Sequence, residues 1–209
     1  MNLKYFSIFL LSAQCFLACE TKETTDLEFL NKIKKYQQLP AVDSFCSFFI
    51  ETNLINKDFD SLILNKSSRI NEFCDTSIGM VRFSNPGAMC YAFIKHPYNI
   101  NFISNKHIPS KWYDNHKKMI SGKLPNGGFC SPSSDIDGIY LKPVEHFPPA
   151  MSVNDHSDVG MHKHKESINK SQKFRLVVLI DGFIFYDLYF VTVSGKWNFY
   201  AVNCCDCST

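Results

Sequence analysis

FRLVVLI-DG-FIFYDLYFVTV-SGK-WNFYAV, residues 174–202, contains the clearest secondary-structure signal of the chain. Asp181-Gly182 lies between two runs rich in β-branched and aromatic residues, and it is a preferred dipeptide for a tight β-hairpin turn. Ser194-Gly195 separates the second run from a third in the same way. The stretch therefore predicts three consecutive antiparallel strands, and the middle one, residues 183–193, is longer than an average strand.

Both faces of this predicted middle strand are largely apolar. One face carries Phe183, Phe185, Tyr189, Val191 and Val193, and the other carries Ile184, Tyr186, Leu188 and Phe190. Asp187 is the only charged residue of the strand, and it falls on the face of Phe185 and Tyr189. Such a strand needs helices on one face of its sheet and loops or a cavity on the other.

The chain before this stretch predicts two helices. Thr25 and Glu28 have the spacing of a capping box, and apolar residues then recur at helical intervals over residues 27–36. Pro40 ends this pattern, and a second helical pattern runs over residues 42–50.

Shorter elements follow the helices. Asn85-Pro86-Gly87 lies between two apolar runs within residues 78–93, which predicts a strand, a turn and a strand. Residues 110–121 predict a short helix, and residues 139–141 a short strand. The fold class expected from the whole chain is α+β, with N-terminal helices packed on a mainly antiparallel sheet that ends in a three-stranded meander.

Composition narrows the classes of function. The chain has 209 residues, 45% of them hydrophobic, which suits one domain with a substantial core. A net charge of +2 provides no basic field for nucleic acid, so we expect no nucleic-acid partner. The chain contains no nucleophile elbow, His-Glu-x-x-His, Walker loop or dinucleotide fingerprint, and we therefore predict no cofactor.

The N-terminus has the pattern of an export signal. A positive start is followed by an apolar run over residues 5–18, which is too short to span a bilayer, and then by an abrupt change to polar residues at Glu20. We predict a signal peptide at residues 1–18, lipid modification by palmitate-type acyl chains on Cys19, a polar tether at 19–26 and one domain at 27–209. Cys15 is a weaker candidate because Gln14 precedes it. Plain secretion and a buried N-terminal helix are the alternatives.

Ala18-Cys19 is similar to the lipobox of bacterial lipoproteins, although Phe16 and Leu17 depart from that pattern. The segment Ile78-Gly79…Arg82…Asn85-Pro86-Gly87 and the terminal Gly195-Lys196-Trp197…Asp206-Cys207-Ser208 resemble parts of uncharacterised lipoproteins of the Bacteroidota. The order of helices first and meander last resembles cystatin-like and NTF2-like folds. These resemblances imply a compartment and a fold, but they assign no activity.

Two groups of residues are candidates for metal or redox chemistry. The chain has nine cysteines, and if it is exported they can form disulfide bonds, although the sequence does not fix the pairing. Cys204, Cys205 and Cys207 favour disulfide or free-thiol roles, with a soft-metal clip as the alternative. His156, His162 and His164 have spacing that suits zinc or copper, but the lysines around them favour a solvated loop.

The functional hypothesis that follows is a non-enzymatic binding or interaction module at the cell envelope, held to a bacterial membrane on its periplasmic or surface side by a lipid anchor. Its partner would be a protein or a small apolar ligand, and an immunity-type role is one version. The alternative is a small periplasmic hydrolase or isomerase that uses Asp187 as a general base in a pocket lined by the sheet. That alternative requires a histidine close to Asp187.

Overall fold

The structure is a computed structural model that describes residues 26–38, 41–55, 69–84, 91–95, 107–148, 151–152, 168 and 170–204. Its helical segments are residues 26–37, α2 (Val42–Asn53), the 3-10 helix η2 (Ile70–Phe73) and α4 (Ser110–His116). Its strands are β1 (Met80–Ser84), β2 (Tyr91–Lys95), β3 (Ile120–Ser121), β4 (Gly138–Val144), β5 (Met151–Ser152), β6 (Lys173–Ile180), β7 (Phe183–Val193) and β8 (Lys196–Cys204). The protein is therefore α+β, as the sequence predicts.

The strands form one mixed sheet in the order β3-β4-β6-β7-β8-β1-β2-β5. β6, β7 and β8 are consecutive antiparallel neighbours, and β4–β6 and β1–β2 are also antiparallel. The pairs β1–β8, β2–β5 and β3–β4 are parallel. The expectation of a mainly antiparallel sheet ending in a meander holds only in part, because β8 continues into a parallel pairing with β1 and so places β6–β8 inside the sheet.

Turn chemistry accounts for both hairpins of the central strands. Asp181 and Gly182 have φ of 53° and 77°, and Ser194 and Gly195 have φ of 49° and 73°. Positive φ at both central residues defines the hairpin turn whose twist matches that of the flanking strands. The carboxylate of Asp137 accepts hydrogen bonds from the backbone N–H groups of Asp181 and Gly182 at 2.7 and 3.0 Å. The first turn is thus fixed both by its own residues and by the segment between β3 and β4, which contains Asp137.

Two irregularities change which side chains face which layer. The pairing of β6 with β7 shifts between Val178 and Leu179, and Phe185 is the additional residue on β7. Ile184 therefore shares a face with Asp187, and Phe185 packs with the helix-side core, which corrects the simple alternation expected from the sequence. The pairing of β7 with β8 shifts in the same way, and it turns Tyr200 onto the face of Tyr189.

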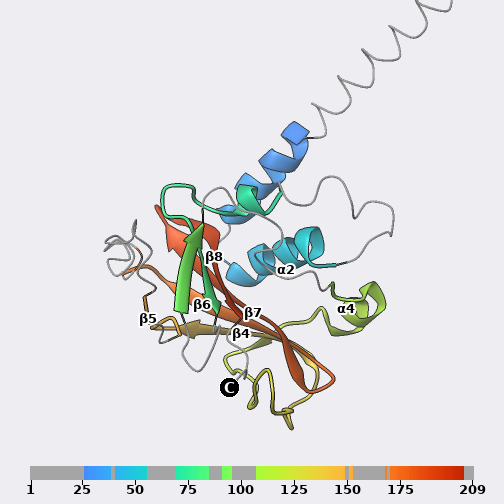
Figure 1. Ribbon diagram of the computed structural model, residues 1–209. Coiled ribbons are helices and arrows are strands. Elements are labelled where there is room, and N and C mark those ends of the chain that lie inside the picture. Colours follow the sequence, from blue (N-terminus) through green and yellow to red (C-terminus); the bar gives the residue numbers. More distant parts are fainter. Residues whose placement is uncertain are drawn as a thin grey trace, which may run out of the picture.

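The main core lies between the sheet and the helices. In Figure 1, α2 and α4 lie on one side of the central strands, and the helix of residues 26–37 lies at one end of the molecule. Phe49 of α2 is fully buried, and its ring centroid lies 5.3 Å from that of Phe190 and 4.6 Å from that of Phe199. Aromatic packing of this kind joins α2 to β7 and β8.

The predicted helix of residues 110–121 is shorter than expected. α4 ends at His116, and Ile120–Ser121 forms β3, which pairs with β4. Residues 120–121 pair with β4, which lies further along the chain, and this pairing overrides their helix propensity. The pattern of residues 110–121 alone does not predict that pairing.

Candidate functional site

Asp187 lies at the centre of a hydrogen-bonded group on three neighbouring strands. Its side chain is fully buried in β7. Nε and Nη2 of Arg175 on β6 donate to its two carboxylate oxygens, both at 2.8 Å, and Nδ2 of Asn203 on β8 donates to Oδ2 at 2.7 Å. Both oxygens of the carboxylate are therefore occupied by donors from the sheet itself.

Burial and ion pairing shift the pKa values of Asp187 and Arg175 in opposite directions. Burial raises the pKa of Asp187 above its ordinary value, although Arg175 and then the Asn203 amide act against that rise. Burial lowers the pKa of Arg175, but the carboxylate of Asp187 more than offsets this effect and leaves the pKa raised. Arg175 therefore stays charged, and it is the group that compensates the buried carboxylate.

This arrangement bears on the hypothesis that Asp187 is a general base. A general base needs an oxygen within hydrogen-bond reach of the proton that it removes from a substrate. Arg175 and Asn203 supply the hydrogen bonds of Asp187, and none comes from a histidine of the part that the structure describes. The geometry is that of a structural ion pair that orients Arg175.

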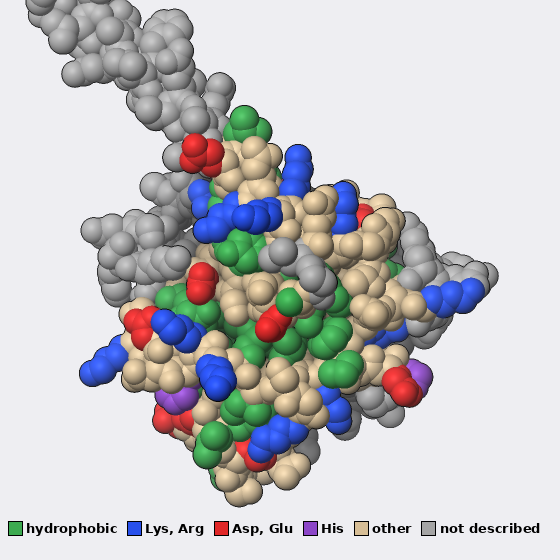
Figure 2. Space-filling model, turned by 180° about the vertical axis from the view of Figure 1, so that it is seen from behind, with side chains coloured by type: hydrophobic (Ala, Val, Ile, Leu, Met, Phe, Trp, Pro, Cys, Tyr) green, Lys and Arg blue, Asp and Glu red, His purple; other side chains and the backbone are tan. Residues whose placement is uncertain are grey.

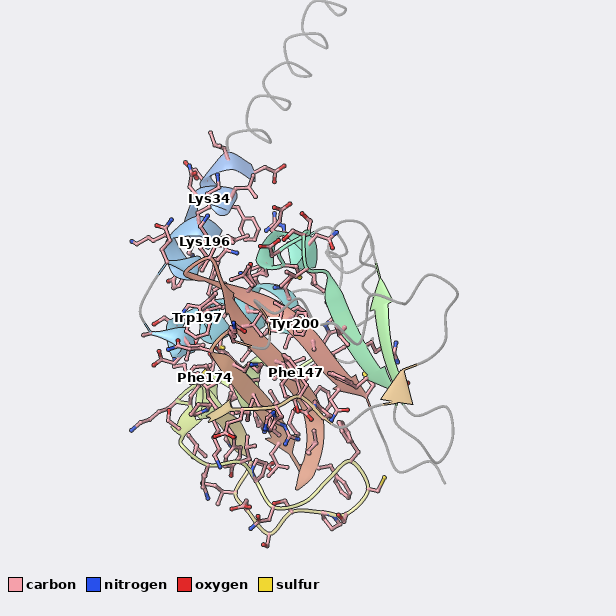
Figure 3. All side chains as sticks on the ribbon, turned by 90° about the vertical axis from the view of Figure 1, so that its left-hand side faces the viewer. Lys34, Phe147, Phe174, Lys196, Trp197 and Tyr200 are labelled. Atoms are coloured by element: carbon pink, nitrogen blue, oxygen red, sulfur yellow. The ribbon has the colours of Figure 1, made fainter. Side chains whose placement is uncertain are left out.

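The face of the sheet that carries Asp187 is opposite to α2, and Ile168 is buried on it against Tyr189 and Tyr200. We call it the helix-free face because segment 26–37, α2, η2 and α4 all contribute to the core on the other side of the sheet. Phe147, which follows β4, has its ring centroid 5.6 Å from that of Tyr189 and 5.1 Å from that of Tyr200. Figure 3 looks toward this face, with Phe147 and Tyr200 near its middle. An aromatic cluster thus lies beside the Arg175–Asp187 pair.

Cationic side chains accompany the aromatic cluster. Lys142 of β4 is exposed and lies directly opposite Arg175 in the strand pairing. Arg175 itself keeps 28% of its side chain exposed, and its guanidinium carbon lies 5.9 Å from the ring centroid of Tyr189. Lys173 lies two residues before Arg175 on the same face of β6 and donates to the carbonyl of Ser171 at 3.1 Å. Lys173 is buried, as are Tyr189 and Tyr200, so among these residues Lys142 and part of Arg175 reach the surface.

A second basic region lies where the described chain begins. Figure 2 shows Lys and Arg side chains gathered near that end of the molecule, and Figure 3 places Lys34 and Lys196 there. Nε2 of Gln37 donates to Oδ1 of Asn198 at 3.3 Å, which attaches the helix of residues 26–37 to β8. Arg69 lies 3.9 Å from the carboxylate of Asp26. This region is separate from the helix-free face.

Several predicted site residues lie outside the described residues, namely Cys15, Cys19, His156, His162, His164, Cys205 and Cys207. Cys204 ends β8, Cys46 and Cys74 are buried, and none of the three is in a disulfide bond. Cys130 is disulfide-bonded, and its partner is not among these three. No group of three metal-binding side chains occurs in the part that the structure describes. Further disulfides and the metal alternatives remain predictions.

The sequence analysis identified Asp187 but not its partners. Arg175 is the only charge within residues 174–180, and the hairpin turn at Asp181-Gly182 brings this run against β7. Regular pairing from that turn would set Leu176 opposite Asp187 and would place Arg175 on the other face of the sheet. The register shift between Val178 and Leu179 brings Arg175 onto the face of Asp187, and the approach of Asn203 likewise depends on the irregular pairing of β8.

In comparisons with known proteins, the chain matches no family model, no curated protein and no solved structure. Among the described helices, none is both long enough and apolar enough to cross a membrane.

Proposed function

We propose that this protein is a non-enzymatic lipoprotein of the bacterial cell envelope that binds a partner through the helix-free face. The observation that carries the proposal is the bonding of Asp187, because both of its oxygens are held by Arg175 and Asn203. The charged residue that best suited catalysis thus serves to orient an arginine that keeps 28% of its side chain exposed and lies opposite the exposed Lys142. Arginine is enriched where proteins bind other proteins.

The lipid anchor is the second part of the proposal. It is supported by Ala18-Cys19 at the change from apolar to polar sequence, and by the short tether of residues 19–26 before the domain. The basic side chains where the described chain begins, Lys34 among them, would favour an anionic membrane surface at that end. The helix-free face would then remain available to a partner.

The likeness to cystatin-like and NTF2-like folds is also part of the proposal. Helices that precede a long antiparallel meander and cover one of its faces support it. NTF2-like folds host enzymes, binding proteins and scaffolds, so the likeness is compatible with an immunity-type role or with binding of an apolar ligand.

Site-specific photocrosslinking in the cell envelope tests the binding function. Glu145 follows β4 next to the helix-free face and is exposed, and Lys111 is exposed on α4, on the helix-covered side. We expect a crosslinker at Glu145 to give a discrete covalent product, and one at Lys111 to give none. Equal products from the two positions, or no product from Glu145, would contradict the proposal.

A further inference from the structure

Cys130 is exposed and disulfide-bonded, and it lies in the segment between β3 and β4. We call residues 122–137 the Cys130 loop. The carbonyl of Gly128 in this loop accepts a hydrogen bond from the backbone N–H of Ile184 on β7 at 3.4 Å. Phe129 packs on side chains of β4, β6 and β7 on the helix-free face. The Cys130 loop is therefore held against the first residues of β7.

The C-terminal end of β8 is directed toward the same place. The amide of Asn203 on β8 donates to Asp187 on β7 at 2.7 Å, and the two strands are antiparallel. The chain that follows Cys204 therefore leaves β8 in the direction of the first residues of β7. Side chains alternate along an extended chain, so the face of Asn203 is also the face to which Cys205 and Cys207 belong. That face is the one on which the Cys130 loop packs.

The other cysteines do not suit this position. Three of them are not in disulfide bonds, namely Cys46, Cys74 and Cys204. Cys90 directly precedes β2, the third strand from β7 in the sheet, which lies about 14 Å from β7 at the usual strand spacing. The Cys130 loop packs toward β6, on the other side of β7, and the Cα atoms of a disulfide lie at most about 7 Å apart.

Cys15 and Cys19 precede the helix of residues 26–37. In Figure 1 this helix lies at the opposite end of the molecule from the Cys130 loop. The proposed signal peptide removes Cys15 and the proposed lipid anchor occupies Cys19, so this step rests on the proposed function. Cys205 and Cys207 are the cysteines that remain.

We propose that Cys130 forms an intrachain disulfide bond with Cys205 or Cys207, which fastens the C-terminal end of the chain to the Cys130 loop. Formation of the bond removes two protons and two electrons from the two thiols. A thiol–disulfide oxidoreductase of the cell envelope accepts them as its own disulfide is reduced to two thiols. The cross-link closes a loop of roughly 75 residues, and it stabilises the fold by limiting the freedom of the unfolded chain.

Tryptic peptide mapping without reduction tests the cross-link on the full chain isolated from the cell envelope, after free thiols have been blocked with iodoacetamide. Trypsin does not cleave before a proline, so Cys130 is the only cysteine of peptide 124–163. The C-terminal cysteines lie in peptide 197–209. We expect mass spectrometry to find these two peptides covalently linked, and reduction to separate them.

Variants then identify the cysteine within peptide 197–209. The double variant Cys205→Ser with Cys207→Ser should lose the linked species and leave Cys130 open to iodoacetamide. Cys204→Ser is the matched control, because it removes a cysteine from the same peptide, and it should retain the link. The map of the parent chain does not depend on the folding of any variant.

Several outcomes would overturn the cross-link. Alkylated Cys130 in the parent chain, or a link from peptide 124–163 to peptide 83–95, which contains Cys90, would do so and leave the lipoprotein function standing. A linked species that occurs only in a dimer on a non-reducing gel, or that is lost in Cys204→Ser, would also exclude the proposed bond. A link to a peptide that contains Cys19 would overturn both the cross-link and the lipid anchor.

Discussion

Arg175 and Asp187 are diagonal neighbours across the β6–β7 hairpin. Arg175 lies opposite Tyr189, and Asp187 lies opposite Val177, so the arginine side chain reaches two residues along β7 to make its pair. A diagonal contact in an antiparallel pair spans about 7 Å between backbones, which a long side chain can bridge. The guanidinium thereby lies over the edge of Tyr189 with its plane fixed by a buried carboxylate.

Removal of one member of this pair should cost more than removal of both. Asp187→Ala leaves a mostly buried guanidinium without its counter-charge, and we expect the free energy of unfolding to fall by about 3 kcal/mol. The double variant Arg175→Met with Asp187→Leu should recover at least half of that loss, because neither charge remains to be compensated. Urea unfolding measures both changes. A single variant as stable as the parent would show that the pair contributes nothing.

Stability should fall as the pH rises into the alkaline range. Burial raises the pKa of the Cys46 and Cys74 thiols, and also of the phenols of Tyr113, Tyr186, Tyr189 and Tyr200. The folded state then holds protons that the unfolded state releases above about pH 8.5 for thiols and about pH 10 for phenols. These groups therefore stabilise the fold fully below about pH 8 and progressively less above it.

Urea unfolding from about pH 7 to about pH 11 measures this dependence, together with tyrosinate absorbance. The urea midpoint should be flat near neutrality and fall above about pH 9, and absorbance from the four buried phenols should rise only with unfolding. A midpoint that rises with pH, or full tyrosinate absorbance while the protein is still folded, would contradict the prediction.

Phe49 should be one of the most sensitive positions of the core. Its buried ring contacts Phe73, Phe190 and Phe199, with ring centroids 4.6 to 5.3 Å apart. Phe49→Ala should lower the free energy of unfolding by about 4 kcal/mol, because it removes buried apolar surface and leaves a cavity. Phe183→Ala is the matched control, since Phe183 is 42% exposed at the hairpin, and it should cost less than about 1 kcal/mol. Similar losses in the two variants would refute the assignment of the core.

The lipid anchor predicts different effects for two neighbouring cysteines. Cys19→Ala should abolish fatty-acid labelling and release the protein from the membrane fraction, because each buried CH₂ of an acyl chain contributes about 0.8 kcal/mol to attachment. Cys15→Ala should leave labelling and membrane retention unchanged. Labelling that persists in Cys19→Ala, or a mature chain that begins after Cys19, would replace the lipoprotein by a plainly secreted protein.

Local signals account for the parts of the fold that the sequence predicted well. Helix 26–37, α2, the β1–β2 pair and the two hairpins depend on contacts between residues close in the chain, so periodicity and turn residues were enough to find them. The short length of α4 and the change of face at Ile184 and Phe185 were missed. Each follows from pairing with another strand, which overrides local alternation.

The residues of the candidate site were also predicted only in part from the sequence. A lone carboxylate inside an apolar strand drew attention to Asp187, but regular pairing from the turn at Asp181-Gly182 would place Arg175 on the other face of the sheet. The side-on geometry of that pair, the bond from Asn203 and the position of Lys142 depend on the register of three strand pairings.

The α+β class, the two tight hairpins and the pattern that predicts export can all be found in the sequence, because each depends on residues that lie next to one another in the chain. The parallel pairing of β8 with β1, the hydrogen bonds to both oxygens of Asp187 and the shared face of Arg175, Lys142 and Tyr200 depend on contacts between strands. The physical reason is that side chains on a strand alternate with a period of two. A bulge of one residue, or a partner distant in the chain, reassigns the face and the neighbours of every side chain beyond it.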